Sequence, residues 1–279
     1  MKKNLIFAAV LCVALVFGFS ACENPDDNEE LLNRIEQLEN QLKDQQSGKD
    51  EDKTDSADKD GDKDTSSDNE QNGEGTPEPE TPTSGTENGY DYVDLGLSVK
   101  WATCNVGADS PEEYGSYFAW GETTPKTTYD WSTYKWCNGS YDTMTKYCTD
   151  SDYGTVDNKT VLDPEDDAAA VNMGGSWRMP TIEEQEELID ECTWTWTTLN
   201  GINGYNVEGP NGNSIFLPAA GYRYGSDLYG AGSYGRYWSS SLNTDDSDYA
   251  YFLYFYSGYV GWDGSDRYYG RSVRGVFSH

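Results

Sequence analysis

The chain has a single histidine, His279, which is the last of its 279 residues. A Ser-His-Asp or Cys-His catalytic centre needs a histidine base, and many zinc sites use a histidine ligand. Carboxylate pairs such as Glu183/Glu187 and Asp166/Asp167 could serve a glycosidase, but on a charged helix face or loop such pairs are usually solvated. No cysteine spacing indicates a metal. The sequence therefore predicts no enzyme, no metal site and no cofactor.

Basic residues are also scarce. The chain has 19 Lys and Arg against 50 Asp and Glu, a net charge of −31. Much of this charge lies in the N-terminal part, but residues 90–279 still carry 28 acidic and 11 basic side chains. Such an excess of negative charge argues against nucleic acid or an anionic membrane surface as a partner.

The last 43 residues, 237–279, lack Lys, Glu, Gln and Met altogether. Residues 90–236 contain 19 of these, a frequency at which about five or six would be expected in the tail. The tail holds eight Tyr instead, with Asp, Ser and Gly between them. Tyr offers a large flat contact and a hydroxyl at low entropic cost, and antibody paratopes use the same mixture of residues. The composition predicts a binding surface.

The N-terminus has the features of a secretion signal. A short basic stretch, Met1–Lys3, precedes an apolar run from Leu5 to Phe19, which is short for a membrane-spanning helix. Phe19-Ser20-Ala21-Cys22 resembles a bacterial lipobox, with residues 1–21 as the signal peptide and Cys22 as the lipidated residue that begins the acidic segment 22–28. We therefore expect a lipid anchor in the outer membrane, with exposure at the cell surface. An uncleaved anchor is the alternative, and it too places the protein outside the cytoplasm.

Two segments separate the anchor from the folded part. Residues 29–47 predict a short coiled-coil helix, because Leu31, Ile35, Leu38 and Leu42 repeat at the spacing of a coiled-coil seam. Arg34-Ile-Glu-Gln-Leu-Glu39 also resembles a short trimerisation motif, Arg-apolar-x-x-apolar-Glu, and this resemblance implies a homotrimer. A frayed helix or a disordered stalk is the alternative. Residues 48–88 have almost no apolar side chains and predict a disordered acidic linker.

Residues 89–279 predict one domain of short strands and loops with one or two helices. Pro180-Thr181-Ile-Glu-Glu184 predicts a helix that begins with a capping box and ends near Cys192. A second short helix is expected around 165–172. Outside the cytoplasm Cys104, Cys137, Cys148 and Cys192 can form disulfides, with Cys137–Cys148 the most local pairing and free thiols the alternative.

Several phrases of this domain resemble one family of extracellular bacterial domains. They include Tyr92–Trp101, Gly175-Ser-Trp-Arg-Met-Pro-Thr181, Ile215–Gly221, Tyr237-Trp-Ser-Ser-Ser241 and Gly270-Arg-Ser-Val-Arg274. The chain resembles the FISUMP surface lipoproteins over essentially all of 89–279. This resemblance implies an α+β fold like that of C-type lectins and the formylglycine-generating enzyme.

The tail resembles the variable region of proteins diversified by diversity-generating retroelements. In such proteins, mutated adenines of Asn codons yield Tyr, Asp, Ser, Gly, Phe and others, but never Lys, Glu, Gln, Met or Trp. The four residue types missing from 237–279 match this restriction. Trp238 and Trp262 would then be fixed positions. A Tyr-rich β surface of fixed sequence is the alternative.

Strand alternation sorts the tail independently of the resemblance. With Leu253 and Phe255 facing the core, Ser257-Gly258 makes a turn, and Val260 and Trp262 face inward. The predicted ligand-binding residues are Asp245, Asp246, Asp248, Tyr249, Phe252, Tyr254, Tyr256, Tyr259, Gly261, Asp263, Ser265, Asp266, Tyr268 and Tyr269. Tyr237–Ser239 and residues 271–276 are expected to be scaffold.

The sequence thus predicts a surface-displayed lipoprotein that binds a protein or glycan ligand through a diversified tail, and that contacts the membrane only through its lipid. Two alternatives stay open. One is a carbohydrate-binding module of fixed sequence, and the other is a structural envelope or fimbria-like component.

Overall fold

The computed structural model describes residues 84–278, which fold mostly into β-sheet with few helices, as the strand-rich α+β prediction requires. The expected signal peptide, Cys22, the coiled coil at 29–47 and the linker up to residue 83 lie outside the described residues. Within 84–278, no helix is long and apolar enough to span a bilayer. Cys104, Cys137, Cys148 and Cys192 are free thiols in this structure.

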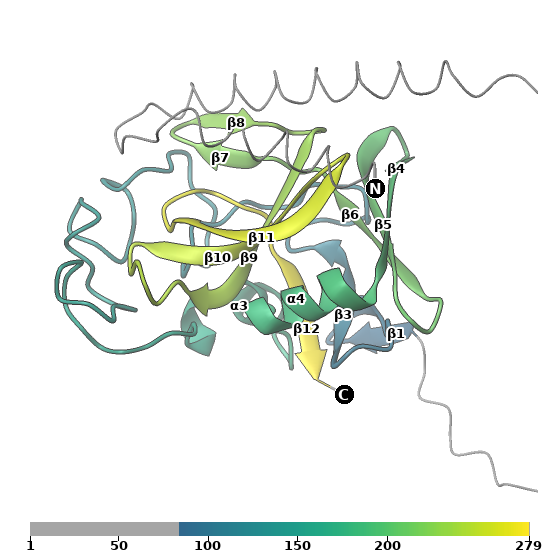
Figure 1. The fold of residues 1–279 in the computed structure, drawn as a ribbon, viewed down its shortest axis with the longest axis horizontal. Coiled ribbons are helices and arrows are strands. Elements are labelled where there is room, and N and C mark those ends of the chain that lie inside the picture. The colour runs from purple at the N-terminus through teal and green to yellow at the C-terminus, as the bar shows by residue number, and fades with distance from the viewer. Residues whose placement is uncertain (1–83, 279) are drawn as a thin grey trace, which may run out of the picture. The chain divides into compact units, whose positions relative to one another are not determined.

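The first sheet joins the two ends of the described chain (Figure 1). Its strands run in the order β1 (Ser84–Glu87), β2 (Tyr90–Val93), β3 (Val99–Asn105) and β12 (Arg274–Ser278), all antiparallel. Val276 of the last strand pairs with Trp101 of β3, and both side chains are buried. The C-terminal residues are therefore scaffold, as expected.

Strand β1 corrects the predicted boundary between linker and domain. The sequence places residues 84–88 in the disordered linker, but Ser84–Glu87 pairs with β2. The turn between them is Asn88-Gly89, and both residues have positive φ angles of 47° and 85°. Asn-Gly is the strongest short hairpin signal because both residues tolerate this backbone conformation. The polar composition of the segment concealed this signal.

The second sheet is central to the candidate site. It is antiparallel in the order β11 (Tyr259–Asp266), β10 (Tyr249–Tyr256) and β9 (Tyr234–Leu242). Strands β10 and β11 form a hairpin in which Tyr256 pairs with Tyr259 across the turn at Ser257-Gly258, so the predicted turn is confirmed.

Helix α4 (Ile182–Glu191) packs against one face of this sheet. Thr181 and Glu184 form the predicted capping box, and Cys192 caps the other end, so both predicted boundaries are confirmed. Leu188 of α4 belongs to the same core cluster as Leu253 and Phe255 of β10. The predicted inward orientation of these two tail residues is therefore confirmed as well.

The predicted second helix is divided in two. Residues Pro164–Asp166 form the 3-10 helix η1, and Ala168–Met173 form α3. Between them Asp167 is extended, and its carboxylate accepts hydrogen bonds from the backbone N–H groups of Ala170 and Met179, at 2.9 and 2.8 Å. Asp167 therefore starts a new helix rather than continuing the first, as an N-cap residue does.

The remaining strands flank the second sheet. A three-stranded sheet contains β4 (Thr193–Leu199), β5 (Ile202–Glu208) and β6 (Ser214–Pro218), and β7 (Tyr222–Tyr224) pairs with β8 (Asp227–Tyr229). The β7–β8 hairpin joins the second sheet through the bridge between Gly221 and Gly235. In Figure 1 this hairpin and α4 lie on opposite sides of the second sheet.

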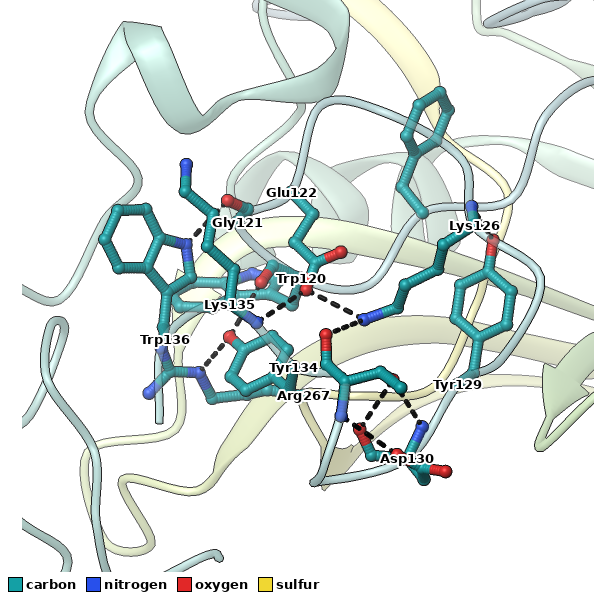
Figure 2. Close-up of polar contacts among 12 residues, drawn as sticks. Trp120, Gly121, Glu122, Lys126, Tyr129, Asp130, Tyr134, Lys135, Trp136 and Arg267 are labelled. Carbon is teal, nitrogen blue, oxygen red and sulfur yellow. Dashed lines mark hydrogen bonds and ion pairs between the residues drawn. The ribbon is translucent and has the colours of Figure 1, made fainter. Parts of the chain in front are cut away.

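The long loop region between β3 and α4 is held to the end of β11 by Arg267, which is fully buried. Its Nε donates to the Tyr134 hydroxyl at 2.8 Å, and its guanidinium lies over the Trp120 ring. Figure 2 also shows a second set of contacts in this region, in which the Glu122 carboxylate accepts from Lys126 Nζ at 2.9 Å and from the Lys135 backbone N–H. The loops are therefore fixed by hydrogen bonds and aromatic packing rather than by regular elements.

Candidate ligand-binding surface

The β10–β11 hairpin has two chemically different faces. On the α4 side, Leu253, Phe255 and Val260 pack in or against the core. On the other side, Tyr254 pairs with Gly261 and Tyr256 pairs with Tyr259. Side chains alternate across a strand, so consecutive residues of β10 serve core and surface in turn.

The tyrosines on the second side contact one another in a continuous series. Tyr256 stacks on Tyr259 with ring centroids 5.6 Å apart, and Tyr254 stacks on Tyr234 at 6.1 Å. Tyr254 also lies 6.0 Å from Tyr259. The guanidinium of Arg236 lies between Tyr254 and Tyr222, at 5.2 and 4.0 Å from their ring centroids. Arg236 thus connects the β9–β10–β11 tyrosines to those of the β7–β8 hairpin.

The β7–β8 hairpin continues the series. Tyr222 stacks on Tyr229 at 5.7 Å and contacts Tyr269 edge-on at 5.6 Å, while Tyr224 lies 5.6 Å from Tyr269. We call the whole surface the tyrosine face. It consists of Tyr222, Tyr224, Tyr229, Tyr234, Arg236, Tyr254, Tyr256, Tyr259 and Tyr269. Of these, Tyr234 is buried and supports the accessible rings through its stacking on Tyr254.

Five members of the tyrosine face precede residue 237 and were not predicted as site residues: Tyr222, Tyr224, Tyr229, Tyr234 and Arg236. The signal that could have found Tyr222 and Tyr224 is the alternation in Gly221-Tyr-Arg-Tyr-Gly225, a short strand between glycines. Tyr224 is 38% exposed, close to the 46% of Tyr259, so the hairpin contributes accessible ring surface of its own.

The fourteen predicted residues divide by exposure. Asp245, Tyr259 and Asp263 are exposed. Eight more are half-buried: Asp246, Tyr249, Tyr254, Tyr256, Gly261, Ser265, Asp266 and Tyr269. Four of the fourteen, Tyr254, Tyr256, Tyr259 and Tyr269, belong to the tyrosine face. Asp245, Asp246 and Asp248 come instead from the turn between β9 and β10.

Phe252, Asp248 and Tyr268 were predicted to be exposed, but all three are buried. Phe252 lies on the outward side of β10, where it packs edge-on against Trp238 at 5.9 Å. Tyr268 packs edge-on against Trp131 at 4.8 Å, within a separate aromatic core. Strand alternation does not reveal that side chains from other segments, such as Trp238 of β9 and Trp131, cover these positions.

Trp262 is the opposite case. It pairs with Leu253 on the α4 side, as predicted, but it is 46% exposed instead of buried. It contacts Tyr251 edge-on at 5.4 Å. The core cluster on this side includes Leu253 and Phe255 but not Trp262. The predicted face is correct and the predicted burial is wrong.

Carboxylates beside the tyrosine face are perturbed by burial. Burial raises the pKa of Asp266 to about 6, and the negative charge of Asp248 adds to this rise. Burial also raises the pKa of Asp248 to about 6, with Asp246 as the charged neighbour. Burial raises the pKa of Tyr254 to about 12, so its hydroxyl is neutral at physiological pH. The face therefore offers neutral hydroxyls and ring surfaces next to weakly acidic groups.

Such a surface is suited to binding. Half-exposed tyrosines held by a hydrogen-bonded sheet provide apolar contact area and hydroxyl hydrogen bonds with little loss of side-chain entropy. Soluble monomers rarely expose contiguous aromatic patches without a partner for them. Among residues 84–278, no group of three or more metal-ligating side chains is placed to hold a metal ion.

A family model for the Lcl C-terminal domain matches residues 93–274. The match covers every element from β3 to the start of β12, and the chain belongs to this family. No curated protein matches the chain. No solved structure matches it either.

Proposed function

We propose that this protein is a surface lipoprotein that binds a protein or glycan ligand through the tyrosine face, and that a diversity-generating retroelement varies the part contributed by residues 237–279. The observation that carries the proposal is the continuous series of tyrosine contacts on the second side of the β10–β11 hairpin. Membership of the Lcl C-terminal domain family is compatible with a variable ligand-binding surface protein.

The difference in accessibility between neighbouring residues of the hairpin supports diversification at Tyr254, Tyr256 and Tyr259. These side chains are accessible, whereas Leu253 and Phe255, the residues on either side of Tyr254, are fully buried. Substitution at Tyr256 or Tyr259 removes ring contacts on the surface but leaves no cavity in the core, whereas Tyr254 also packs against a core cluster. A strand of this kind can change its ligand while keeping its fold.

The remaining features extend the proposal. The FISUMP-like phrases and the strand-rich α+β architecture support a fold like that of C-type lectins. The lipobox at Cys22 supports lipid anchoring in the outer membrane, and the seam at Leu31–Leu42 supports a homotrimer. Three copies of one face would raise a weak affinity through avidity. We propose binding rather than catalysis, without cofactor and without nucleic acid as partner.

The test is to amplify and sequence codons 237–279 from a population of the source cells, together with the flanking DNA. We expect variation confined to accessible codons such as those of Tyr254, Tyr256 and Tyr259, with Leu253 and Phe255 constant, and an adenine-rich near-copy beside a reverse transcriptase. An invariant tail without a template copy would refute diversification and leave a fixed adhesin or an envelope component.

The anchor has its own test. Metabolic labelling with a palmitate analogue should modify the full-length chain and not the Cys22→Ala variant. An unlabelled native chain would show that Cys22 carries no lipid.

A further inference from the structure

Three arginines near the C-terminus are fully buried, and two of them have clear structural partners. Arg267 donates to the Tyr134 hydroxyl and to the backbone carbonyls of Lys146, Tyr147 and Ser247. Arg274 donates from Nε to Asn105 at 2.9 Å, and from its terminal nitrogens to the carbonyls of Ala102, Thr103 and Phe216. Each of these guanidiniums is satisfied by acceptors within the fold.

Arg271, the third arginine, has no such partners. None of its three side-chain nitrogens has a hydrogen-bond acceptor among the described residues, although all are buried. Its guanidinium lies over the rings of Phe252 and Trp238, at 3.4 and 4.2 Å from the centroids, and 5.6 Å from that of Tyr269. A buried donor without an acceptor is costly, and a buried charge more so. Burial lowers the pKa of Arg271 well below its usual range.

A second arginine, Arg236, adds positive charge and a further unsatisfied donor near Arg271. The positive charge of Arg236, on the tyrosine face, also lowers the pKa of Arg271, and its own Nε has no hydrogen-bond acceptor within 84–278. The pKa of Arg271 is raised by three nearby acidic groups, the Asp263 and Asp266 carboxylates and the Tyr269 hydroxyl, but none of them accepts a hydrogen bond from Arg271. No ion pair among residues 84–278 includes either arginine. The described part of the chain therefore supplies no carboxylate that pairs with either guanidinium.

We propose that Arg236 and Arg271 form an anion subsite of the tyrosine face, and that it takes a carboxylate group of the bound ligand. This inference rests on the proposed function and specifies part of its ligand. A planar carboxylate can accept two parallel hydrogen bonds from one guanidinium edge. The Phe252 and Trp238 rings lie over the Arg271 guanidinium, so its in-plane N–H groups are the ones left for such a carboxylate.

The approach to the subsite leads through Arg236. Arg236 is half-buried on the tyrosine face, whereas Arg271 is fully buried and its guanidinium lies 5.6 Å from the centroid of the Tyr269 ring. A carboxylate would first contact Arg236 and would reach Arg271 when the half-exposed Tyr269 ring turns aside. The buried carboxylate would then accept hydrogen bonds from the Arg271 side-chain nitrogens, which are not accessible to water.

Stability measurements distinguish a structural arginine from a binding one. We expect Arg271→Met to leave the melting temperature of the full chain unchanged or to raise it, because it removes unsatisfied donors and keeps the packing volume. Arg267→Met should lower the melting temperature, because it leaves the Tyr134 hydroxyl and several carbonyls without their donor. A loss for Arg271→Met as large as for Arg267→Met would overturn the proposal.

Binding is tested with sodium acetate as the probe and sodium chloride at matched ionic strength as the control, by NMR of the arginine Nε–Hε groups. We expect acetate, and not chloride, to shift the Arg236 and Arg271 signals. Arg271→Met should weaken the acetate response at Arg236 by about ten- to a hundredfold, as loss of a charged hydrogen bond predicts. Arg223→Met is the matched control, because Arg223 lies nearby over Tyr117 and should leave the acetate response unchanged.

Equal shifts with acetate and chloride, or an unchanged response in Arg271→Met, would overturn the subsite. Glucuronate and N-acetylglutamate then distinguish an acidic sugar from a peptide side chain as the source of the carboxylate. Failure of the subsite and failure of the proposed diversification can be told apart. Acetate binding together with an invariant tail would support the subsite and refute diversification. A variable tail without acetate binding would support diversification and refute the subsite.

Discussion

The contact between Gly235 and Phe255 gives the sharpest test of the scaffold under the tyrosine face. Gly235 of β9 pairs directly with Phe255 of β10, and the Phe255 ring covers the place where a side chain at 235 would lie. The three atoms that a Cβ at this position would meet first all belong to that ring. Aromatic cover of a strand glycine by its cross-strand neighbour is a known way to fill this gap.

The Phe255 ring has little freedom to move aside. It stacks on Tyr237 at 5.9 Å and contacts Tyr205 at 5.3 Å and Trp194 at 5.9 Å. Forcing extra volume into a packed core typically costs about 1–3 kcal/mol, and we expect this for Gly235→Ala. Phe255→Ala removes a fully buried ring and should cost about 3–5 kcal/mol.

A double variant isolates the interaction energy between positions 235 and 255. Once the ring is gone, a methyl group at position 235 fits, so Gly235→Ala/Phe255→Ala should be about as stable as Phe255→Ala alone. The expected interaction energy is therefore about 1–3 kcal/mol, within the range for side chains in contact. Urea unfolding followed by tryptophan fluorescence measures all four proteins. Costs that simply add would refute the reasoning, because they would mean that the ring does not exclude a side chain at 235.

Three further predictions address the helix cap, the tail and the acidic groups. Thr181→Ala should destabilise the fold by about 1 kcal/mol in urea, because it removes the N-cap of α4; an unchanged midpoint would contradict the capping box. Tyr237→Phe should lower the free energy of unfolding by about 1–3 kcal/mol, because the buried hydroxyl donates to the Pro218 carbonyl at 2.6 Å. Tyr259→Phe, at an exposed position, should leave the free energy of unfolding unchanged. Equal effects of the two substitutions would show that exposure does not separate scaffold from surface. Asp248 and Asp266 have pKa values of about 6 in the folded protein, so between about pH 4 and 6 they bind more protons in the folded than in the unfolded state. The free energy of unfolding should therefore rise as the pH falls from 7 to 5, and the double variant Asp248→Asn/Asp266→Asn should reduce this pH dependence. A pH dependence that the substitutions leave unchanged would assign it to other groups.

Local sequence signals predicted the elements whose causes are themselves local. The capping box at Thr181 and Glu184 fixed the start of α4, and the alternation around Leu253 and Phe255 fixed the inward side of β10. The Ser257-Gly258 turn then set the register with β11. Each of these depends on residues within a few positions of one another, so a single sequence suffices to find it.

Burial that depends on distant segments could not be predicted in this way. Phe252 is buried because Trp238 and Arg271 cover the outward side of β10 at that position, whereas Tyr254 and Tyr256 on the same side stay half-exposed. Trp262 is exposed although it shares a side with Leu253. The contribution of Tyr222 and Tyr224 does not follow from the unusual composition of 237–279, because both residues precede that segment. The β7–β8 hairpin meets the tail only in the folded protein.

The tyrosine face therefore has two parts with different origins in the sequence. Tyr222, Tyr229 and Arg236 precede the tail, while Tyr254, Tyr256 and Tyr259 lie within it. Under the proposed diversification, the first part stays constant while the second varies. Arg271 is buried beneath the face and belongs to the predicted scaffold, so it would also be constant. A constant carboxylate subsite beside a variable aromatic surface would give every variant the same anchoring group and a different selectivity. Variants with unrelated tails should then share the acetate response at Arg236 while differing in the ligands they retain, and loss of that response with each change of tail would contradict a constant subsite.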